Sequence, residues 1–134
     1  MKPTSRRKFI TAAAVLGTSV AASAISVSAS EKKQLVHHVF FWLKNPDSVE
    51  DRDKLVEGVK TLGNIKTIRK LHVGVLASTE KRDVVDTSWQ VSELMFFDDL
   101  QGQLTYQTHP IHLAFIEKYS HLWAKVLVYD AMEA

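Results

Sequence analysis

The chain has 134 residues, a length that suits one ordinary domain. Hydrophobic residues make up 46% of it and charged residues 24%, which is typical of a globular protein and excludes a disordered tail or a collagen-like fibre. The sequence contains no cysteine, so disulfides, thiolate metal ligands and a cysteine nucleophile are excluded.

The formal net charge of +2 is unevenly distributed along the chain. Four of the 17 Lys and Arg residues lie in the first ten positions, and no acidic residue precedes Glu31. Without these four, 13 basic residues remain against 15 acidic ones, a net charge of −2. Because binding to a phosphate backbone needs clustered Lys and Arg, we expect no nucleic-acid partner.

Residues 1–29 are typical of an export signal. A basic opening, residues 5–10 (SRRKFI), precedes an alanine-rich apolar stretch and small-residue triplets that end at Ala24 or Ala29. The apolar stretch is too short and interrupted to cross about 30 Å of hydrocarbon. The opening resembles a twin-arginine signal, which predicts a periplasmic or secreted protein with no stable membrane anchor after cleavage. An uncleaved basic N-terminal anchor is the alternative.

Strand and helix patterns fill residues 30–134, which we predict to form one domain. Segments rich in β-branched and aromatic residues predict strands at 35–43, 65–76, 87–97 and 123–130. Helical spacing of apolar residues predicts helices at about 49–61 and 100–105 and a third one from Pro110, with Ser48 and Asp99 as N-caps. Gly74 suggests a bulge in the second strand. This order predicts an α+β, ferredoxin-like antiparallel sheet with its helices on one face.

The first predicted strand is apolar on both of its faces. His38, Phe40 and Trp42 point to one side, whereas residues 37, 39, 41 and 43 point to the other. The chain's own helices can cover only one face. Leaving large apolar side chains in water forfeits about 1.5–3 kcal/mol each. We therefore expect an identical subunit to cover the second face by packing sheet on sheet.

Residues 106–119 (YQTHPIHLAFIEKY) resemble the stress-responsive A/B barrel (Dabb) family. The opening strand, residues 38–44 (HVFFWLK), and the closing strand, residues 126–130 (VLVYD), match the same family. The resemblance covers about residues 35–130. It implies a homodimer in which two ferredoxin-like sheets meet as a dimeric α/β barrel.

The resemblance also implies a site between the sheet and the helices. Some plant members of the family are polyketide cyclases that use a Tyr and a His of this motif, which by position are Tyr106 and His112. His38 would line the same cavity together with Phe40 and Trp42. The residues expected to bind a ligand are Phe40, Trp42, His109 and Phe115. Where several members carry Tyr-x-His on the third strand, this chain has residues 89–91 (WQV).

The motif residues themselves suggest acid–base chemistry. A Tyr hydroxyl near a neutral imidazole can serve as an acid–base pair, because His titrates near pH 6.5. Alternatively, His109 and His112 cap and orient a helix while Tyr106 packs in the core. The spacing of His109 and His112 could also hold a metal with His38 or Glu93. His109, however, precedes a proline and is expected to be non-helical, so we predict no metal and no cofactor.

Glu93 is the second candidate for acid–base chemistry. It lies in mid-strand between the same-face neighbours Val91 and Met95. An unpaired buried carboxylate is costly, which predicts a partner, and His38 is the expected one. Alternatively, Glu93 is an inward-pointing charge that protects an edge strand, or it is bonded across the dimer interface.

Three functions remain open from the sequence. The first is an exported homodimer, with a role in stress, that binds a small apolar or aromatic molecule in the sheet–helix cavity. The second is a cofactor-free acid–base enzyme, a cyclase or isomerase, that uses Tyr106, His112, His38 and Glu93. The third is a structural stress protein whose cavity is filled by side chains. The size of the cavity distinguishes the third function from the other two.

Overall fold

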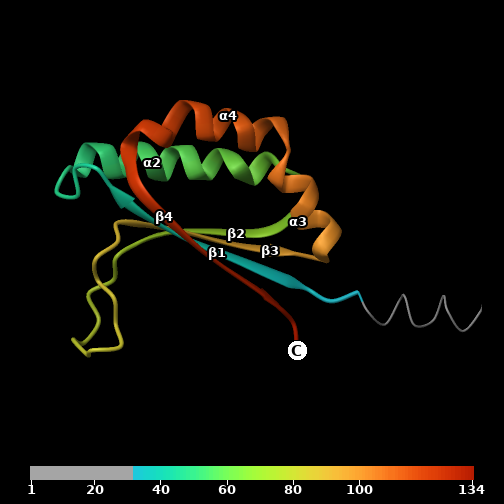
Figure 1. Ribbon diagram of the computed structural model, residues 1–134, viewed down its shortest axis with the longest axis horizontal. Coiled ribbons are helices and arrows are strands. Elements are labelled where there is room, and N and C mark those ends of the chain that lie inside the picture. Colours follow the sequence, from blue (N-terminus) through green and yellow to red (C-terminus); the bar gives the residue numbers. More distant parts are fainter. Residues whose placement is uncertain (1–31) are drawn as a thin grey trace, which may run out of the picture. The chain divides into compact units, whose positions relative to one another are not determined.

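The computed structural model describes residues 32–134, and the export signal predicted at residues 1–29 lies outside this range. Figure 1 shows the elements in the predicted order β-α-β-β-α-α-β. Within residues 32–134, no helix has the length and apolar character that crossing a bilayer requires. The elements are β1 (Leu35–Leu43), α2 (Val49–Thr61), β2 (Ile68–Val75), β3 (Val91–Phe97), α3 (Leu100–Gln107), α4 (Pro110–Tyr119) and β4 (Trp123–Met132), with 3₁₀ turns at Leu62–Asn64 and Ser120–Leu122.

The strands form one antiparallel sheet in the order β2-β3-β1-β4. All helices lie on the same face of this sheet (Figure 1). The arrangement confirms the predicted ferredoxin-like α+β fold. It places β1 and β3 in the centre, and leaves β2 and β4 as the edge strands.

Side-chain caps fix where the helices begin. Ser48 and Asp99 each accept a hydrogen bond from the backbone N–H three residues later, at 3.1 and 2.8 Å, which confirms both predicted N-caps. His109 caps α4, since its Nδ1 accepts a hydrogen bond from the N–H of Ile111 at 3.1 Å. Pro110 follows at the first helical position, where its missing N–H costs nothing. His109 is thus non-helical, as its place before a proline predicts.

The predicted strand boundaries differ from the observed ones in the middle of the chain. β2 starts at Ile68 because a turn, closed by the Ile68 N–H on the Ile65 carbonyl, precedes it. The bulge predicted at Gly74 was wrong, since the register shift lies between Ile68 and Lys70. Gly74 pairs with Ser92, and a Cβ there would lie 2.8 Å from the Ser92 hydroxyl. A close approach between strands therefore explains this glycine.

The core lies between the sheet and the helices. The side chains of β1 alternate strictly, and residues 35, 37, 39, 41 and 43 are buried on the helix side. They pack with Val91, Met95 and Phe97 of β3 and with Leu55 and Val59 of α2, all fully buried. This helix-covered face also carries the polar residues of the candidate site.

The opposite face of the sheet has no cover within residues 32–134 (Figure 1). We call it the open face, and it confirms that the chain's helices cover only one side. Most side chains on this face are half-buried or exposed in the single chain. Apart from Ser92, which is buried, its residues include Val36, His38, Phe40 and Trp42 of β1, Leu94 and Phe96 of β3, and Leu127 and Tyr129 of β4.

Candidate functional site

A pocket of about 430 Å³ lies between α4 and the strands β1 and β4. One part of its wall is apolar and includes three aromatic side chains in mutual contact, with centroid distances of 5.0–6.3 Å. The remaining wall is polar. The apolar lining residues are Val39, Phe41, Phe115, Ile116, Trp123, Val126 and Val128, and the polar ones are His37, Glu93, Gln107, His112 and Asp130.

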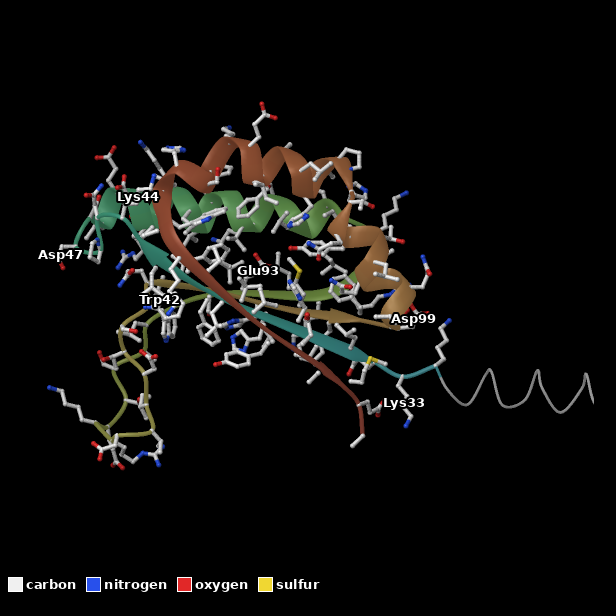
Figure 2. All side chains as sticks on the ribbon, viewed as in Figure 1. Lys33, Trp42, Lys44, Asp47, Glu93 and Asp99 are labelled. Carbon is white, nitrogen blue, oxygen red and sulfur yellow. The ribbon has the colours of Figure 1, made fainter. Side chains whose placement is uncertain are left out.

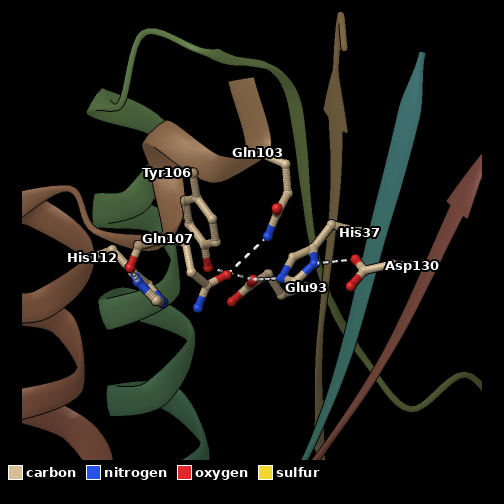
Figure 3. A network of polar contacts seen from close by, with 7 residues as sticks. All are labelled: His37, Glu93, Gln103, Tyr106, Gln107, His112 and Asp130. Atoms are coloured by element: carbon tan, nitrogen blue, oxygen red, sulfur yellow. Dashed lines mark hydrogen bonds and ion pairs between the residues drawn. The ribbon is translucent and has the colours of Figure 1, made fainter. Parts of the chain in front are cut away.

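Glu93 is the most deeply buried polar residue of the pocket, with 1% of its surface exposed. Its Oε2 accepts a hydrogen bond of 3.2 Å from the Tyr106 hydroxyl (Figure 3). Burial raises the pKa of the Glu93 carboxyl to about 8, against the weaker lowering effect of that hydrogen bond. At neutral pH the pocket therefore holds a carboxylic acid that has a proton to donate.

Tyr106 holds Glu93 in place from the helix layer. Burial and the neighbouring Glu93 carboxyl raise the pKa of the Tyr106 phenol, so it stays protonated and cannot act as a base. Its ring lies 4.3 Å from the His112 ring, centroid to centroid. Tyr106 is not among the residues that line the pocket. Its geometry is that of a residue that positions both Glu93 and His112.

His37 connects the buried acid to the edge strand. Its Nδ1 lies 2.5 Å from Oδ1 of Asp130 on β4 (Figure 3). Because a carboxylate only accepts hydrogen bonds, Nδ1 carries the proton of this bond. The other ring nitrogen, Nε2, is 3.9 Å from Glu93 Oε2, which is too long for a hydrogen bond. The Nε2 atom of His37 therefore lies beside the Glu93 carboxyl without a hydrogen bond to it.

His112 presents a second basic nitrogen. Its Nδ1 donates a hydrogen bond of 3.0 Å to the carbonyl of Gln107, which fixes the tautomer and leaves the lone pair on Nε2. Burial lowers the pKa of the His112 imidazole, and His37 lowers it further, whereas the Gln107 carbonyl acts in the opposite direction. His112 is therefore neutral at pH 7. Gln103 steadies the same segment by donating a 2.9 Å hydrogen bond to the Gln107 side chain.

Charge limits what the pocket can bind. No Lys or Arg is among its lining residues, so a carboxylate or phosphate ligand would have no cationic partner. The polar wall instead offers the Nε2 atoms of two imidazoles and the Glu93 carboxylic acid, next to Gln107 and Asp130 and beside an apolar wall. Such a set can move protons on an uncharged molecule.

His38 does not belong to this pocket, so two predictions about it were wrong. Cross-strand pairing puts Glu93 opposite Val39, on the helix-covered face, and His38 opposite Leu94, on the open face. Its ring packs against the Phe40 ring in a tilted arrangement, 4.3 Å between centroids, on the opposite side of the sheet from Glu93. The burial pattern of β1 explains the difference, because the odd-numbered residues face the helices.

Three of the four predicted ligand-binding residues also lie outside the pocket. Phe40 and Trp42 are on the open face, for the reason just given for His38. His109 uses its Nδ1 to cap α4 and does not line the pocket. Phe115 does line it, as does His112.

Sequence reasoning missed His37, Gln107 and Asp130. His37 was given no role in the sequence analysis, but it is buried on the helix side. The sequence did contain a signal for His37: Val91, Glu93 and Met95 alternate along β3 and therefore lie on one face of the sheet. Antiparallel pairing of β3 with β1 gives these residues His37, not His38, as a same-face neighbour.

Within residues 32–134, no group of three or more His, Asp or Glu side chains is arranged to hold a metal ion. His109 and His112 do not share a helix face, because His109 precedes α4 as its cap.

Residues 35–133 match the stress responsive A/B barrel domain. The chain belongs to this Dabb family. The match includes every strand and helix described above, and it contains the sheet, the pocket and the open face. Comparison with curated protein sequences gave no match.

Solved Dabb-like structures share the fold at low sequence identity. A Dabb family protein from Mesorhizobium loti superimposes with a TM-score of 0.62 at 22% identity, covering 76% of this chain and 98% of its own. A dimeric protein of unknown function from Bacteroides fragilis gives a TM-score of 0.59 at 23% identity, covering 75% and 96%. The hydroxynitrile lyase of Passiflora edulis gives 0.64 at 17% identity, covering 77% and 95%. The Mesorhizobium loti and Bacteroides fragilis proteins are both described as having a ferredoxin-like fold.

Proposed function

We propose that this Dabb protein binds a small, uncharged, mainly apolar molecule in the sheet–helix pocket and transfers protons on it without a cofactor. The observation that carries the proposal is the placement of a protonated carboxylic acid, Glu93, and a neutral imidazole, His112, in one largely apolar pocket. Glu93, with a pKa of about 8, is protonated at neutral pH, and His112 has a lowered pKa. Groups whose protonation is tuned in this way are typical of acid–base sites.

Each polar residue of the pocket has a distinct role in the proposed proton transfer. His112 Nε2, or His37 Nε2 held by Asp130, accepts a proton from a hydroxyl or from a carbon next to a carbonyl. Glu93 donates a hydrogen bond to the oxygen on which negative charge develops. Tyr106 positions Glu93 and stays protonated. The hydroxynitrile lyase among the structural neighbours supports the view that this fold can carry such chemistry.

The pocket supports this function over a cavity filled by side chains. Phe40 and Trp42 lie on the open face and cannot fill the pocket, and a volume of about 430 Å³ is left beside Phe115. Binding sites for small organic molecules have volumes of about 300–1,000 Å³. A binding protein with a role in stress that leaves its ligand unchanged is the alternative, and the following experiment separates the two.

Phenylacetone, an uncharged aromatic ketone, is a suitable probe of proton transfer. In D₂O, NMR should show that the protein accelerates deuterium exchange at the carbon atoms next to the carbonyl. We expect His112→Ala to reduce this rate about 10²-fold or more, as for the loss of a general base. His121→Ala, which removes an exposed histidine, is the matched control and should keep the full rate.

Fluorescence of N-phenyl-1-naphthylamine, an uncharged apolar dye, reports pocket binding in the same samples. Saturable binding of the dye without any deuterium exchange of phenylacetone would favour the binding protein over the enzyme. If neither dye nor ketone binds, the pocket is not a ligand site and both functions are rejected.

We also propose that the protein is a homodimer formed through the open face. Two of the structural neighbours, from Bacteroides fragilis and Thermobifida fusca, are described as dimeric. The apolar and aromatic residues of the open face support the same assembly, because burying them would gain about 25 cal/mol per Å². The expected state of residues 30–134 in light scattering is twice the monomer mass.

Export to the periplasm, or secretion, is the proposed route of this protein. The paired Arg6 and Arg7 followed by Phe9 support a twin-arginine signal. Replacing both arginines by lysine keeps the charge and should block export, which cell fractionation and immunoblotting would measure. Lys2→Arg, which leaves the pair untouched, should export normally. Equal export of all three proteins would reject the twin-arginine proposal.

A further inference from the structure

Residues 76–90 form a long connection between β2 and β3, which we call the arm. The flanking residues Val75 and Val91 are still paired in the sheet, where most hairpins would need only 2–5 loop residues. Figure 1 shows the arm extending away from the sheet on the side opposite the helices. It therefore extends into the space that a second copy would occupy if it packed on the open face.

The root of the arm is fixed by hydrogen bonds. The indole N–H of Trp42 donates to the Ser88 hydroxyl at 2.9 Å, and the indole N–H of Trp89 donates to the Asp86 carbonyl at 3.0 Å. The Ser88 N–H in turn donates to the Asp86 carboxylate at 2.8 Å. Figure 2 shows Trp42 at the end of the sheet from which the arm extends. These bonds set the direction of the arm before any partner arrives.

The reach of the arm exceeds the spacing between packed sheets. Each limb has about seven residues, and an extended chain spans about 3.3 Å per residue, which gives a reach of roughly 20 Å. Face-to-face sheets lie about 10 Å apart. An arm of this length is long enough to reach past the sheet of a second copy packed on the open face.

Two features of the arm call for cover by another protein. Val84 is 81% exposed, so an apolar side chain of the arm has almost no contact within its own copy. At the root, a recess of about 210 Å³ lies between aromatic side chains of the open face, ready to receive a side chain. The charges of residues 80–83 (EKRD) are mixed in sign, which disfavours nucleic acid and membranes as partners. The recess is lined by Phe40, Trp42, Asp86, Trp89, Leu127 and Tyr129.

We infer that the arm of each copy clasps the second copy of this chain across the open-face interface. The inference rests on the proposed homodimer, and it goes further by assigning part of the binding energy to residues 76–90. The contact is reciprocal, because a two-fold dimer carries two arms and two recesses. The arm adds contacts at the edges of the two sheets, and these contacts fix the position of one sheet relative to the other.

Sedimentation equilibrium of arm variants tests the inference. In one variant, residues 79–85 are replaced by Asn-Gly, a turn that closes a hairpin and keeps the hydrogen-bonded root. We expect the dimer Kd to rise at least tenfold in this variant and severalfold in Val84→Asp. Val49→Asp, at a valine of α2 that is 59% exposed, is the matched control and should keep the wild-type Kd.

The outcomes separate the arm from the dimer. If the wild type is dimeric and the shortened arm leaves its Kd unchanged, the clasp is refuted and the dimer stands. If the wild type is a monomer, the proposed dimer is refuted and the clasp with it. The deuterium-exchange experiment judges the acid–base function independently of both results.

A crosslink identifies what the arm touches. The sequence has no cysteine, so Val84→Cys offers a unique thiol for a maleimide-benzophenone label. In an equal mixture of ¹⁵N-labelled and unlabelled protein, photolysis should give crosslinked peptides that join heavy and light chains. Crosslinks confined to heavy–heavy and light–light peptides in a freely exchanging mixture would refute the contact between copies.

Discussion

The effect of Glu93→Gln on the free energy of unfolding is expected to change sign with pH. Above pH 8 the variant should be more stable than the wild type. The folded state holds the Glu93 proton up to a pKa of about 8, whereas the ordinary value is 4.5. Between these values the folded state binds more protons than the unfolded state, so the free energy of unfolding falls as the pH rises. The total loss is on the order of 4–5 kcal/mol, at about 1.4 kcal/mol per pKa unit.

Urea denaturation from pH 4 to pH 9, at one fixed protein concentration, measures this effect. The difference in unfolding free energy between wild type and Glu93→Gln should change steadily from pH 4.5 to 8 and then level off. Below pH 4.5 the acid is protonated in both states and the difference should be constant. Glu117→Gln, at an exposed glutamate of α4, should give no pH-dependent difference. Parallel curves for Glu93→Gln and the wild type would mean that Glu93 titrates normally.

Tyr129→Asp is expected to convert the proposed dimer into a monomer. Tyr129 is 60% exposed in the single chain, so the change should cost the isolated fold less than about 1 kcal/mol. Across a packed interface the same change buries an unpaired carboxylate among aromatic rings, Phe40 among them, at 6.2 Å between centroids. Loss of a central aromatic residue costs about 2 kcal/mol or more, which raises the Kd at least about 30-fold.

Light scattering over a concentration series measures the dissociation, with thermal unfolding as the check on folding. Leu113→Asp, at a leucine of α4 that is 53% exposed, places the same charge on the helix layer and should leave the dimer intact. A Tyr129→Asp protein that stays dimeric at the wild-type Kd would place the interface away from the open face.

Most of the fold was accessible from the sequence because its local signals agree with one another. The boundaries of β1, the caps Ser48 and Asp99, and the start of α4 at Pro110 were all predicted correctly. The start of β3 was not, because residues 87–90 have a strand-like composition but serve as the root of the arm. Composition reflects only the local preference of residues 87–90 for a strand. Here the hydrogen bonds of Trp42 and Trp89 to the arm outweigh that preference.

The candidate site was predicted only in part, because it depends on which side of a strand faces the helices. His37 and His38 are adjacent, and both alternating sets of β1 are apolar, so hydrophobicity could not choose between them. Pairing with β3 and β4 decides the matter, since His37 lies opposite Met95 and Asp130. That register arises from contacts far apart in sequence. His112 and Tyr106, by contrast, lie within one local motif and were found together as expected.

The alternation of β1 gives this small protein two independent surfaces on a single strand. Substitutions at positions 37, 39 and 41 change the pocket, whereas substitutions at positions 38, 40 and 42 change the opposite face of the sheet. Variants with a larger or smaller pocket can therefore be selected without altering the proposed dimer interface on the open face. Evolution has the same freedom, so residues that line the pocket and residues on the open face can diverge independently of one another.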